Sequence, residues 1–275
     1  MAYRKGSRPR AYSSRFLPSL LLFHVCLLAL RFVDRVVYGL RVRGRPNLGA
    51  FSSALLVSNH TLVMDPGIIA HAIRPRRACF TMLEETALVP VLGTFVRLLG
   101  AIPIPEGAGS LVCLERAVRE AMRDPGCVHV FPEGECYLWN QDIRPFHPGA
   151  FVLACRLRLP VVPITTVLHA HRRSRTAGAG AAGGRAPGRP RVTVVVGEPV
   201  YPDRFLDGGS PRRSAMAMAA HVRHLMQLTI EREGGSHALY RGQMPRLVRQ
   251  AQAPTESTLT HARSRAEMRA HSMSR

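Results

Sequence analysis

The strongest constraint on the fold is a short apolar run that ends directly before a histidine and an aspartate. Residues 54–66 read ALLVSNHTLVMDP, so that Asn59 and His60 follow the run and Asp65 comes five residues after His60. A short apolar run bounded by turn residues is typical of a buried strand. Aspartate followed by proline is typical of a helix start, with the aspartate as N-cap. The pattern therefore predicts a tight loop between a buried strand and a helix.

These two side chains are of the types that a general base requires. Across a tight loop, the carboxylate of Asp65 can hold one ring nitrogen of His60 and leave the other nitrogen basic near neutral pH. The spacing alone is weak evidence, because a surface histidine followed by an unrelated helix-capping aspartate gives the same pattern. Other parts of the sequence are needed to choose between the two interpretations.

Two further apolar stretches end in polar or proline-marked segments. Residues 127–134 read CVHVFPEG, and residues 159–166 read LPVVPITT. Strand-like and helix-like segments alternate along the chain, which favours an α/β fold with a mostly parallel or mixed sheet flanked by helices. The ends of three strands would then meet at one edge of the sheet, where ligands of such sheets usually bind.

Apolar periodicity and turn residues predict the other elements. A first strand is expected within residues 36–44, and further strands at 79–83, 101–104 and 192–196. Helices are expected at 67–73, 89–99 and 146–157, and two more begin at Ser110 and at Ser210.

The segments NHTLVMD, VFPEG and VVPI, in this order, resemble the blocks of the PlsC-like glycerolipid acyltransferases, a family that includes lysophosphatidate acyltransferases and tafazzin. The resemblance covers residues 40–201, and the combination is specific although each segment alone is not. In that family, the histidine of the first block deprotonates the acceptor hydroxyl, which attacks an acyl thioester directly. The acyl donor is acyl-CoA or acyl carrier protein, and no bound cofactor or metal is expected.

The resemblance assigns a role to several residues of this chain. His60 and Asp65 correspond to the HX4D motif, with His60 as general base and Asp65 as its partner. The acceptor is expected to be a lysophospholipid such as 1-acylglycerol-3-phosphate. Its binding residues would be Asn59, Pro132, Glu133, Gly134 and Arg144, and residues 162–164 would help to shape the pocket.

At two positions the chain departs from the family pattern. Family members that use phosphate-bearing acceptors often carry arginines where this chain has Glu106 and Cys136. An acid in place of a phosphate-binding arginine repels that phosphate. Either the acceptor has a different head group, or another arginine such as Arg144 replaces the missing ones.

The formal net charge is +20, and Lys5 is the only lysine among 38 basic residues. This composition excludes a P-loop lysine, a Schiff-base lysine elsewhere in the chain and a Ser-x-x-Lys nucleophile. Abundant arginine suits phosphate-bearing partners, here anionic membrane lipids, although a general arginine bias would give the same composition. Nucleic acid is not expected as a partner, because the sequence has few aromatic residues and no recognition motif.

The six cysteines form no Cys-x2-Cys pair and no zinc-like grouping with histidine. Most of them lie in apolar segments. We therefore expect buried free thiols in a reducing compartment instead of disulfides.

The N-terminal region carries a membrane signal. Residues 1–15 are basic, and residues 16–30 are apolar apart from Ser19 and His24. Fifteen residues are fewer than the roughly 20 that span a bilayer, which favours an interfacial helix over a span. A signal peptide would also need a small-residue cleavage site, which does not follow. We expect a membrane-associated protein with its catalytic domain on the cytoplasmic side.

The expected organisation has three parts: residues 1–35 as the basic N-terminus and membrane helix, 36–233 as the acyltransferase domain, and 234–275 as a basic, partly disordered tail. A mobile Arg/Gly/Ala-rich insert is expected at 171–190. Two other functions remain open: a transacylase that moves acyl chains between phospholipids, and a non-enzymatic basic binder of membrane or nucleic acid.

Overall fold

The computed structural model describes residue 28 and residues 35–83, 101–104, 110–123, 126–170, 189–206 and 209–245. Several expected features lie outside these residues: the basic segment 1–15, the apolar segment 16–30 apart from Leu28, the helix at 89–99, Glu106, most of the insert at 171–190, and the tail beyond residue 245. Within the described ranges, none of the helices combines the length and the apolar character needed to cross a bilayer.

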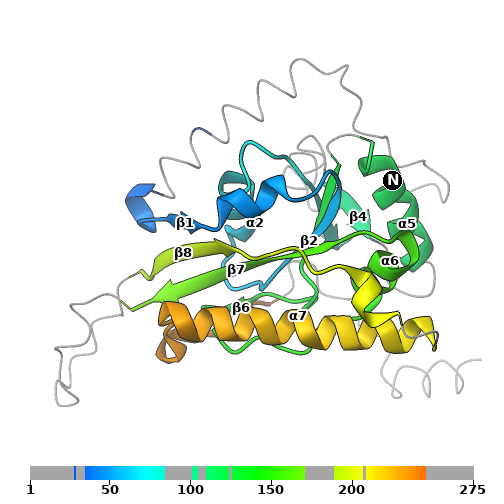
Figure 1. Cartoon of the computed structure of the whole chain (residues 1–275). Coiled ribbons are helices and arrows are strands. Elements are labelled where there is room, and N and C mark those ends of the chain that lie inside the picture. Colours follow the sequence, from blue (N-terminus) through cyan, green and yellow to red (C-terminus); the bar gives the residue numbers. More distant parts are fainter. Residues whose placement is uncertain are drawn as a thin grey trace, which may run out of the picture. The chain divides into compact units, whose positions relative to one another are not determined.

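Seven of the described strands form a mixed sheet in the order β1-β8-β7-β2-β5-β3-β4 (Figure 1). Every neighbouring pair is parallel except β7 and β8, which are antiparallel. The strands are β1 (Arg41–Arg43), β2 (Ala54–Ser58), β3 (Cys79–Leu83), β4 (Ile102–Ile104), β5 (Cys127–Val130), β7 (Val161–His169) and β8 (Arg191–Val196). The fold class expected from the sequence is confirmed.

Helices cover both faces of this sheet (Figure 1). They are α2 (Asp65–Ala72), α5 (Ser110–Ala121), α6 (Gly149–Leu157) and α7 (Pro211–Glu233), with short 3-10 helices η1 (Arg45–Gly49), η3 (Pro202–Phe205) and η4 (His237–Leu239). Side chains of α5, α6 and α7 share one buried apolar cluster, whereas those of α2 and η1 belong to a second one.

Strand β2 is the centre of the fold because it is buried on both faces. Leu55 and Val57 pack into the cluster with α5, α6 and α7, and Ala54 and Leu56 pack into the cluster with α2. All four side chains are fully buried, and burial of each larger one stabilises the fold by about 2 kcal/mol. A continuous apolar strand of this kind is typical of a parallel sheet covered by helices on both sides.

The register of β2 and its neighbours fixes where the functional loops begin. Val57 lies opposite Val130 of β5 on one side and opposite Pro163 of β7 on the other. Because β2 and β5 are parallel and end within one residue of each other in the register, the segments that follow them leave the sheet at the same edge. His60 and the turn at residues 131–134 are therefore neighbours.

The first strand is shorter than the sequence suggests. Residues 35–37 are helical, and β1 contains only three residues, paired with Thr193–Val195 of β8. Gly39 and Gly44 flank it with φ of 54° and 73°. These left-handed conformations end the extended backbone on both sides, and glycine adopts them without steric cost.

A small second sheet ties the end of α7 to the loop after β5. Strand β9 (Gly242–Gln243) pairs antiparallel with β6 (Tyr137–Leu138). The compact unit that contains the main sheet extends to Met244, beyond the boundary expected at residue 233.

Candidate active site

His60 and Asp65 form a hydrogen-bonded pair at the end of β2. The Nδ1 atom of His60 lies 3.0 Å from Oδ2 of Asp65. Because a carboxylate accepts, Nδ1 carries the proton and Nε2 keeps its lone pair. The His60 side chain is 20% exposed, whereas Asp65 is fully buried. The basic nitrogen is thus available at the edge of the sheet, and its partner is shielded from water.

The carboxylate of Asp65 also organises the loop that carries His60. Its Oδ2 accepts the N–H groups of Thr61 and Leu62, each at 2.7 Å. The N-cap of α2 is Met64, and Asp65 is the first helical residue. The expected N-cap role of Asp65 is wrong, because its side chain turns back to the preceding loop. Its second oxygen, Oδ1, is buried and has no hydrogen-bond partner among the described residues.

Phe131 orients the ring of His60 from the neighbouring strand end. The two rings are stacked, with centroids 4.0 Å apart and an angle of 20° between their planes. This contact fixes the ring plane while the hydrogen bond to Asp65 fixes the rotation within that plane. His60 is therefore held at two points before any substrate binds.

Asn59 connects the His60 loop to strand β7. Its side-chain amide donates to the carbonyl of Thr166 at 2.9 Å, and its Oδ1 accepts the N–H of Thr166 at 2.8 Å. Asn59 is only 2% exposed. The side chain completes the backbone pairing of β7 beyond the end of β2, so the structure places it under the site and not at its surface.

Glu133 is buried beside His60. Its Oε1 accepts the backbone N–H of His60 at 3.0 Å, and its Oε2 accepts the backbone N–H of Arg144 at 3.1 Å. Burial raises the pKa of Glu133 to about 7, although these two hydrogen bonds and the nearby His60 oppose the increase.

The turn at residues 131–134 has the backbone that its sequence predicts. Pro132 is buried at the second position, and the N–H of Gly134 donates to the carbonyl of Phe131 at 3.1 Å. Gly134 is exposed and has φ of 76°. A Cβ atom at this position would lie 3.0 Å from Cδ2 of His147. Glycine is thus required here both for its conformation and for space.

The loop after this turn lies along the His60 segment. The N–H of Tyr137 donates to the carbonyl of His60, and that of Trp139 donates to the carbonyl of Thr61. The guanidinium carbon of the exposed Arg144 lies 4.7 Å from the ring centroid of Tyr137. Tyr137 thus connects the guanidinium of Arg144 with the backbone of His60.

The segment after α7 packs against this loop at Trp139. Arg241 stacks over Trp139 at 5.1 Å, and its N–H donates to the carbonyl of Leu138. Trp139 packs on the cluster that contains α2. Trp139 thus fixes the loop to the core.

Cys136 occupies one of the two positions where the family carries an arginine. It is buried, and burial raises the pKa of its thiol to about 12, with further increases from Asp65, Glu133 and Glu135. It is therefore a neutral thiol. Glu106, at the other position, lies outside the described residues. The four described cysteines whose side chains are placed form no disulfide and are buried: Cys79, Cys127, Cys136 and Cys155.

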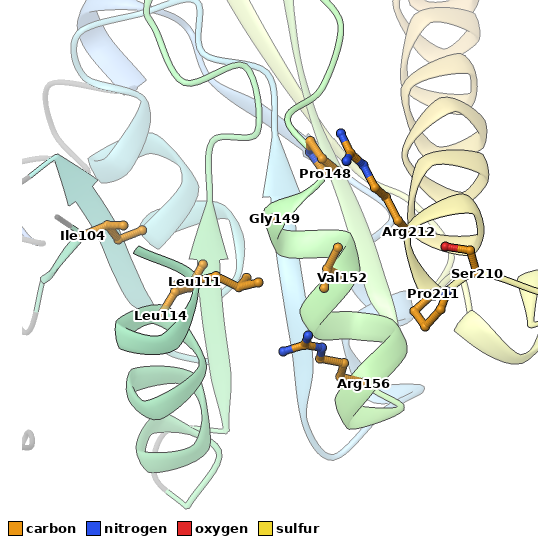
Figure 2. Close-up of a pocket in the computed structure, with 10 residues that line it drawn as sticks. All are labelled: Ile104, Leu111, Leu114, Pro148, Gly149, Val152, Arg156, Ser210, Pro211 and Arg212. Atoms are coloured by element: carbon orange, nitrogen blue, oxygen red, sulfur yellow. The ribbon is translucent and has the colours of Figure 1, made fainter. Parts of the chain in front are cut away.

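A cavity of about 470 Å³ lies between α5 on one side and α6 with the start of α7 on the other (Figure 2). Ile104, Leu111, Leu114 and Val152 give it an apolar lining, and Arg156 and Arg212 contribute guanidinium groups. Pro148, which also lines it, directly follows His147. An apolar cavity with few polar groups is typical of a small-molecule site.

The structure brings His60, Asp65, Asn59, Pro132, Glu133, Gly134 and Arg144 together at one edge of the sheet. Residues 162–164 lie deeper: Val162 and Ile164 are fully buried in the core. Phe131, the first residue of the FPEG segment, supports His60, and the sequence pattern did not indicate this contact. Within the described residues, no group of histidine, cysteine and acidic side chains is arranged to hold a metal ion.

The fold and the site place an imidazole, held by a buried carboxylate, at the carboxyl edge of a mostly parallel sheet. The family profile described as Acyltransferase matches residues 39–167. The chain is 28% identical over 135 residues to a chloroplastic 1-acyl-sn-glycerol-3-phosphate acyltransferase of Brassica napus, covering 46% of this chain and 37% of that protein.

Two further comparisons agree. The human 1-acyl-sn-glycerol-3-phosphate acyltransferase beta is 30% identical over 135 residues, covering 46% of each chain. The crystal structure of the 1-acyl-sn-glycerophosphate acyltransferase PlsC from Thermotoga maritima has a TM-score of 0.55 and 18% sequence identity, covering 81% of this chain and 85% of that chain, and so has the same fold. This chain spans less than half the length of either curated relative. Residues 39–167 are thus similar to the Acyltransferase family.

Proposed function

We propose that this protein transfers an acyl chain from an acyl thioester, acyl-CoA or acyl carrier protein, to the hydroxyl of a lysophospholipid such as 1-acylglycerol-3-phosphate. The observation that carries the proposal is the His60–Asp65 pair, with Nδ1 held at 3.0 Å and Nε2 at the partly exposed edge. The similarity to enzymes named 1-acyl-sn-glycerol-3-phosphate acyltransferase supports the same reaction.

In the proposed reaction, His60 acts first as a base and then as an acid. Its Nε2 removes the proton of the acceptor hydroxyl while the oxygen attacks the thioester carbonyl carbon. The carbon–sulfur bond of the tetrahedral intermediate then breaks, and the imidazolium returns the proton to the leaving thiolate. The buried carboxylate of Asp65 stabilises the imidazolium between the two steps.

This reaction needs no covalent acyl-enzyme. A thioester is already activated, so binding it beside the acceptor and one base supplies much of the rate increase. The sequence contains no G-x-S-x-G segment for a serine nucleophile. Stacking on Phe131 and the hydrogen bond to Asp65 give His60 the fixed orientation that direct attack requires.

We place the acceptor against the turn at residues 132–134, with Arg144 toward its anionic head group. Arg144 is exposed and stacked on Tyr137, so its guanidinium keeps donors for a phosphate. The apolar cavity beside α5 and α6 suits an acyl chain. The basic charge and the apolar segment 16–30 favour a membrane-associated enzyme with this site on the cytoplasmic side.

The test is product identification. Membranes containing the protein are incubated with labelled acyl-CoA or acyl carrier protein and a panel of lysolipids, and the products are identified by mass. We expect a diacyl product with one of the lysolipids and release of the free thiol. Absence of thioester consumption with every acceptor contradicts the proposal.

A second arm identifies the donor. Diacyl phospholipid and lysolipid are supplied without any thioester, and acyl exchange is measured. If acyl exchange between the two lipids is as fast as the thioester reaction, the protein is a transacylase instead. The His60→Ala variant in each arm shows whether the activity depends on this site.

A further inference from the structure

The side chain of Glu133 accepts hydrogen bonds from the backbone of two loops. One oxygen accepts the N–H of His60 at 3.0 Å, and the other accepts the N–H of Arg144 at 3.1 Å. The side chain is only 5% exposed. Both oxygens therefore face the protein, although the FPEG segment lies at the edge where the acceptor is proposed to bind.

These two hydrogen bonds join the parts of the site that must act together. The segment at His60 carries the base, and the segment at Arg144 carries the proposed head-group residue and leads through His147 to α6. The N–H of His147 is held by the carbonyl of Pro132 at 2.8 Å. The turn that carries Glu133 is thus the common support of both segments.

We propose that Glu133 is a positioning residue: its ionised carboxylate sets the separation between the His60 and Arg144 backbones and does not contact the acceptor. This inference rests on the proposed function of His60. A buried carboxylate that accepts two N–H groups holds both of them with charge-assisted hydrogen bonds, which are stronger than those to a neutral acceptor. A misplacement of the base by about 1 Å can lower the rate by about 10²-fold.

Protonation of Glu133 is expected to weaken this support. A protonated carboxyl carries a donor hydroxyl on one oxygen, so it no longer accepts equally at both amides. The charged and titratable groups around it are His60, which favours the ionised form, and Asp65, which opposes it. The Cys136 thiol is neutral, and the Arg144 contact is through its backbone N–H. Burial is the largest influence and places the pKa of Glu133 at about 7.

The test is the split between kcat and KM in Glu133→Gln. Glutamine has the same size but only one acceptor oxygen. One of the two backbone N–H groups therefore faces the NH2 group of the glutamine side chain, which cannot accept its hydrogen bond. We expect kcat to fall about 10- to 100-fold, with KM for the lysolipid within about twofold of the wild type. The ratio of wild-type to variant kcat should decrease from pH 8 to pH 6, because the wild-type carboxyl becomes protonated over this interval.

Two variants complete the experiment. Glu198→Gln makes the same change on an exposed residue after β8 and is expected to keep the wild-type kcat. Arg144→Ala keeps the backbone N–H that donates to Glu133. We therefore expect this variant to raise KM for the lysolipid. If Glu133→Gln does not fold, Glu133→Asp takes its place, because its shorter side chain keeps the charge but does not reach both amides.

An increase in lysolipid KM of tenfold or more at nearly unchanged kcat, in either Glu133 variant, overturns the inference and makes Glu133 an acceptor-binding residue. A ratio of kcat values that is constant with pH also contradicts it. With either of these two results, an inactive His60→Ala variant still supports the proposed function. An active His60→Ala variant removes the proposed function itself.

Discussion

His60 and His129 lie against the same ring and have opposite properties. The ring centroid of Phe131 is 4.0 Å from that of His60 and 4.5 Å from that of His129. His60 is partly exposed and bound to a carboxylate, whereas His129 is fully buried and its Nε2 is 2.8 Å from the hydroxyl of Ser58. Histidine near the edge of the sheet is thus not sufficient for a base.

The difference lies in the partner and in access to solvent. Burial, with a smaller contribution from His60, lowers the pKa of His129 to about 3, so its ring stays neutral at physiological pH. Its Nδ1 is buried and has no partner in the described part of the chain. A ring that cannot be charged does not take up a proton in a reaction, whereas a carboxylate beside His60 stabilises the charged form.

Removal of the charge on Asp65 should make His60 more like His129. In Asp65→Asn, the amide oxygen still accepts from the loop, but the imidazolium loses its negative partner. We expect kcat to fall about 10³-fold or more, as in other histidine–aspartate pairs, measured as thiol release with saturating lysolipid. Asp203→Asn, which changes an exposed carboxylate paired with Arg158, serves as the control. A loss of less than tenfold in Asp65→Asn would show that the carboxylate is only structural.

Disturbing the turn should affect His60 and leave His129 in place. In Gly134→Ala, the new Cβ meets the ring of His147 at 3.0 Å, in addition to the strain of φ at 76°. We expect about a tenfold lower kcat, because the turn carries both Phe131 and Glu133. Gly234→Ala is the matched control: its φ is 72°, and nothing lies within 4 Å of the added atom.

Both glycine variants should lose about 1 kcal/mol of stability from left-handed strain. Only Gly134→Ala should lose activity, which thermal unfolding and kcat measured on the same preparations will show. Equal kcat values in the two variants would contradict the role of the turn.

Replacing His129 should change stability more than activity. In His129→Phe, kcat is expected to stay within about threefold, and the loss of the Ser58 partner should cost about 1 kcal/mol at pH 7.5. The lowered pKa of His129 means that the unfolded chain binds a proton between about pH 6.5 and 3 that the folded chain does not. Wild-type stability should therefore fall as the pH decreases through this window, by about 2 kcal/mol at pH 5 from this residue.

The variant should lack this contribution, so its stability relative to the wild type should improve at pH 5. Denaturant unfolding at pH 7.5 and pH 5 measures the difference. His224→Phe, on the exposed side of α7, controls for the general loss of a histidine. If the stability of His129→Phe falls as steeply as that of the wild type when the pH is lowered from 7.5 to 5, His129 is not held neutral.

Most of the site could be predicted from the sequence because its residues lie next to strand ends. The apolar runs before His60 and Phe131 predict strands β2 and β5, and the pairing of parallel strands then brings the two segments together. The expected pair of His60 and Asp65 is present at hydrogen-bond distance. Local sequence was sufficient here since the relevant contacts follow directly from the order of the strands.

The features that the sequence did not predict depend on contacts between distant segments. The pairing of β6 with β9 joins residues about 100 positions apart, and two-residue strands have no recognisable periodicity. The side chain of Asp65 was expected to cap α2, but it turns to the loop because three donors converge there. The backbone contacts of Glu133 likewise depend on where the segment at Arg144 lies, which its own sequence does not specify.

The most direct test of the account compares His60→Ala with His129→Phe in one assay of acyl transfer from labelled acyl-CoA to a lysolipid. We expect His60→Ala to lose at least about 10³-fold in kcat while its thermal unfolding matches that of the wild type, and His129→Phe to retain most of the activity. Wild-type turnover in a folded His60→Ala variant, or loss of turnover in a folded His129→Phe variant, would contradict it.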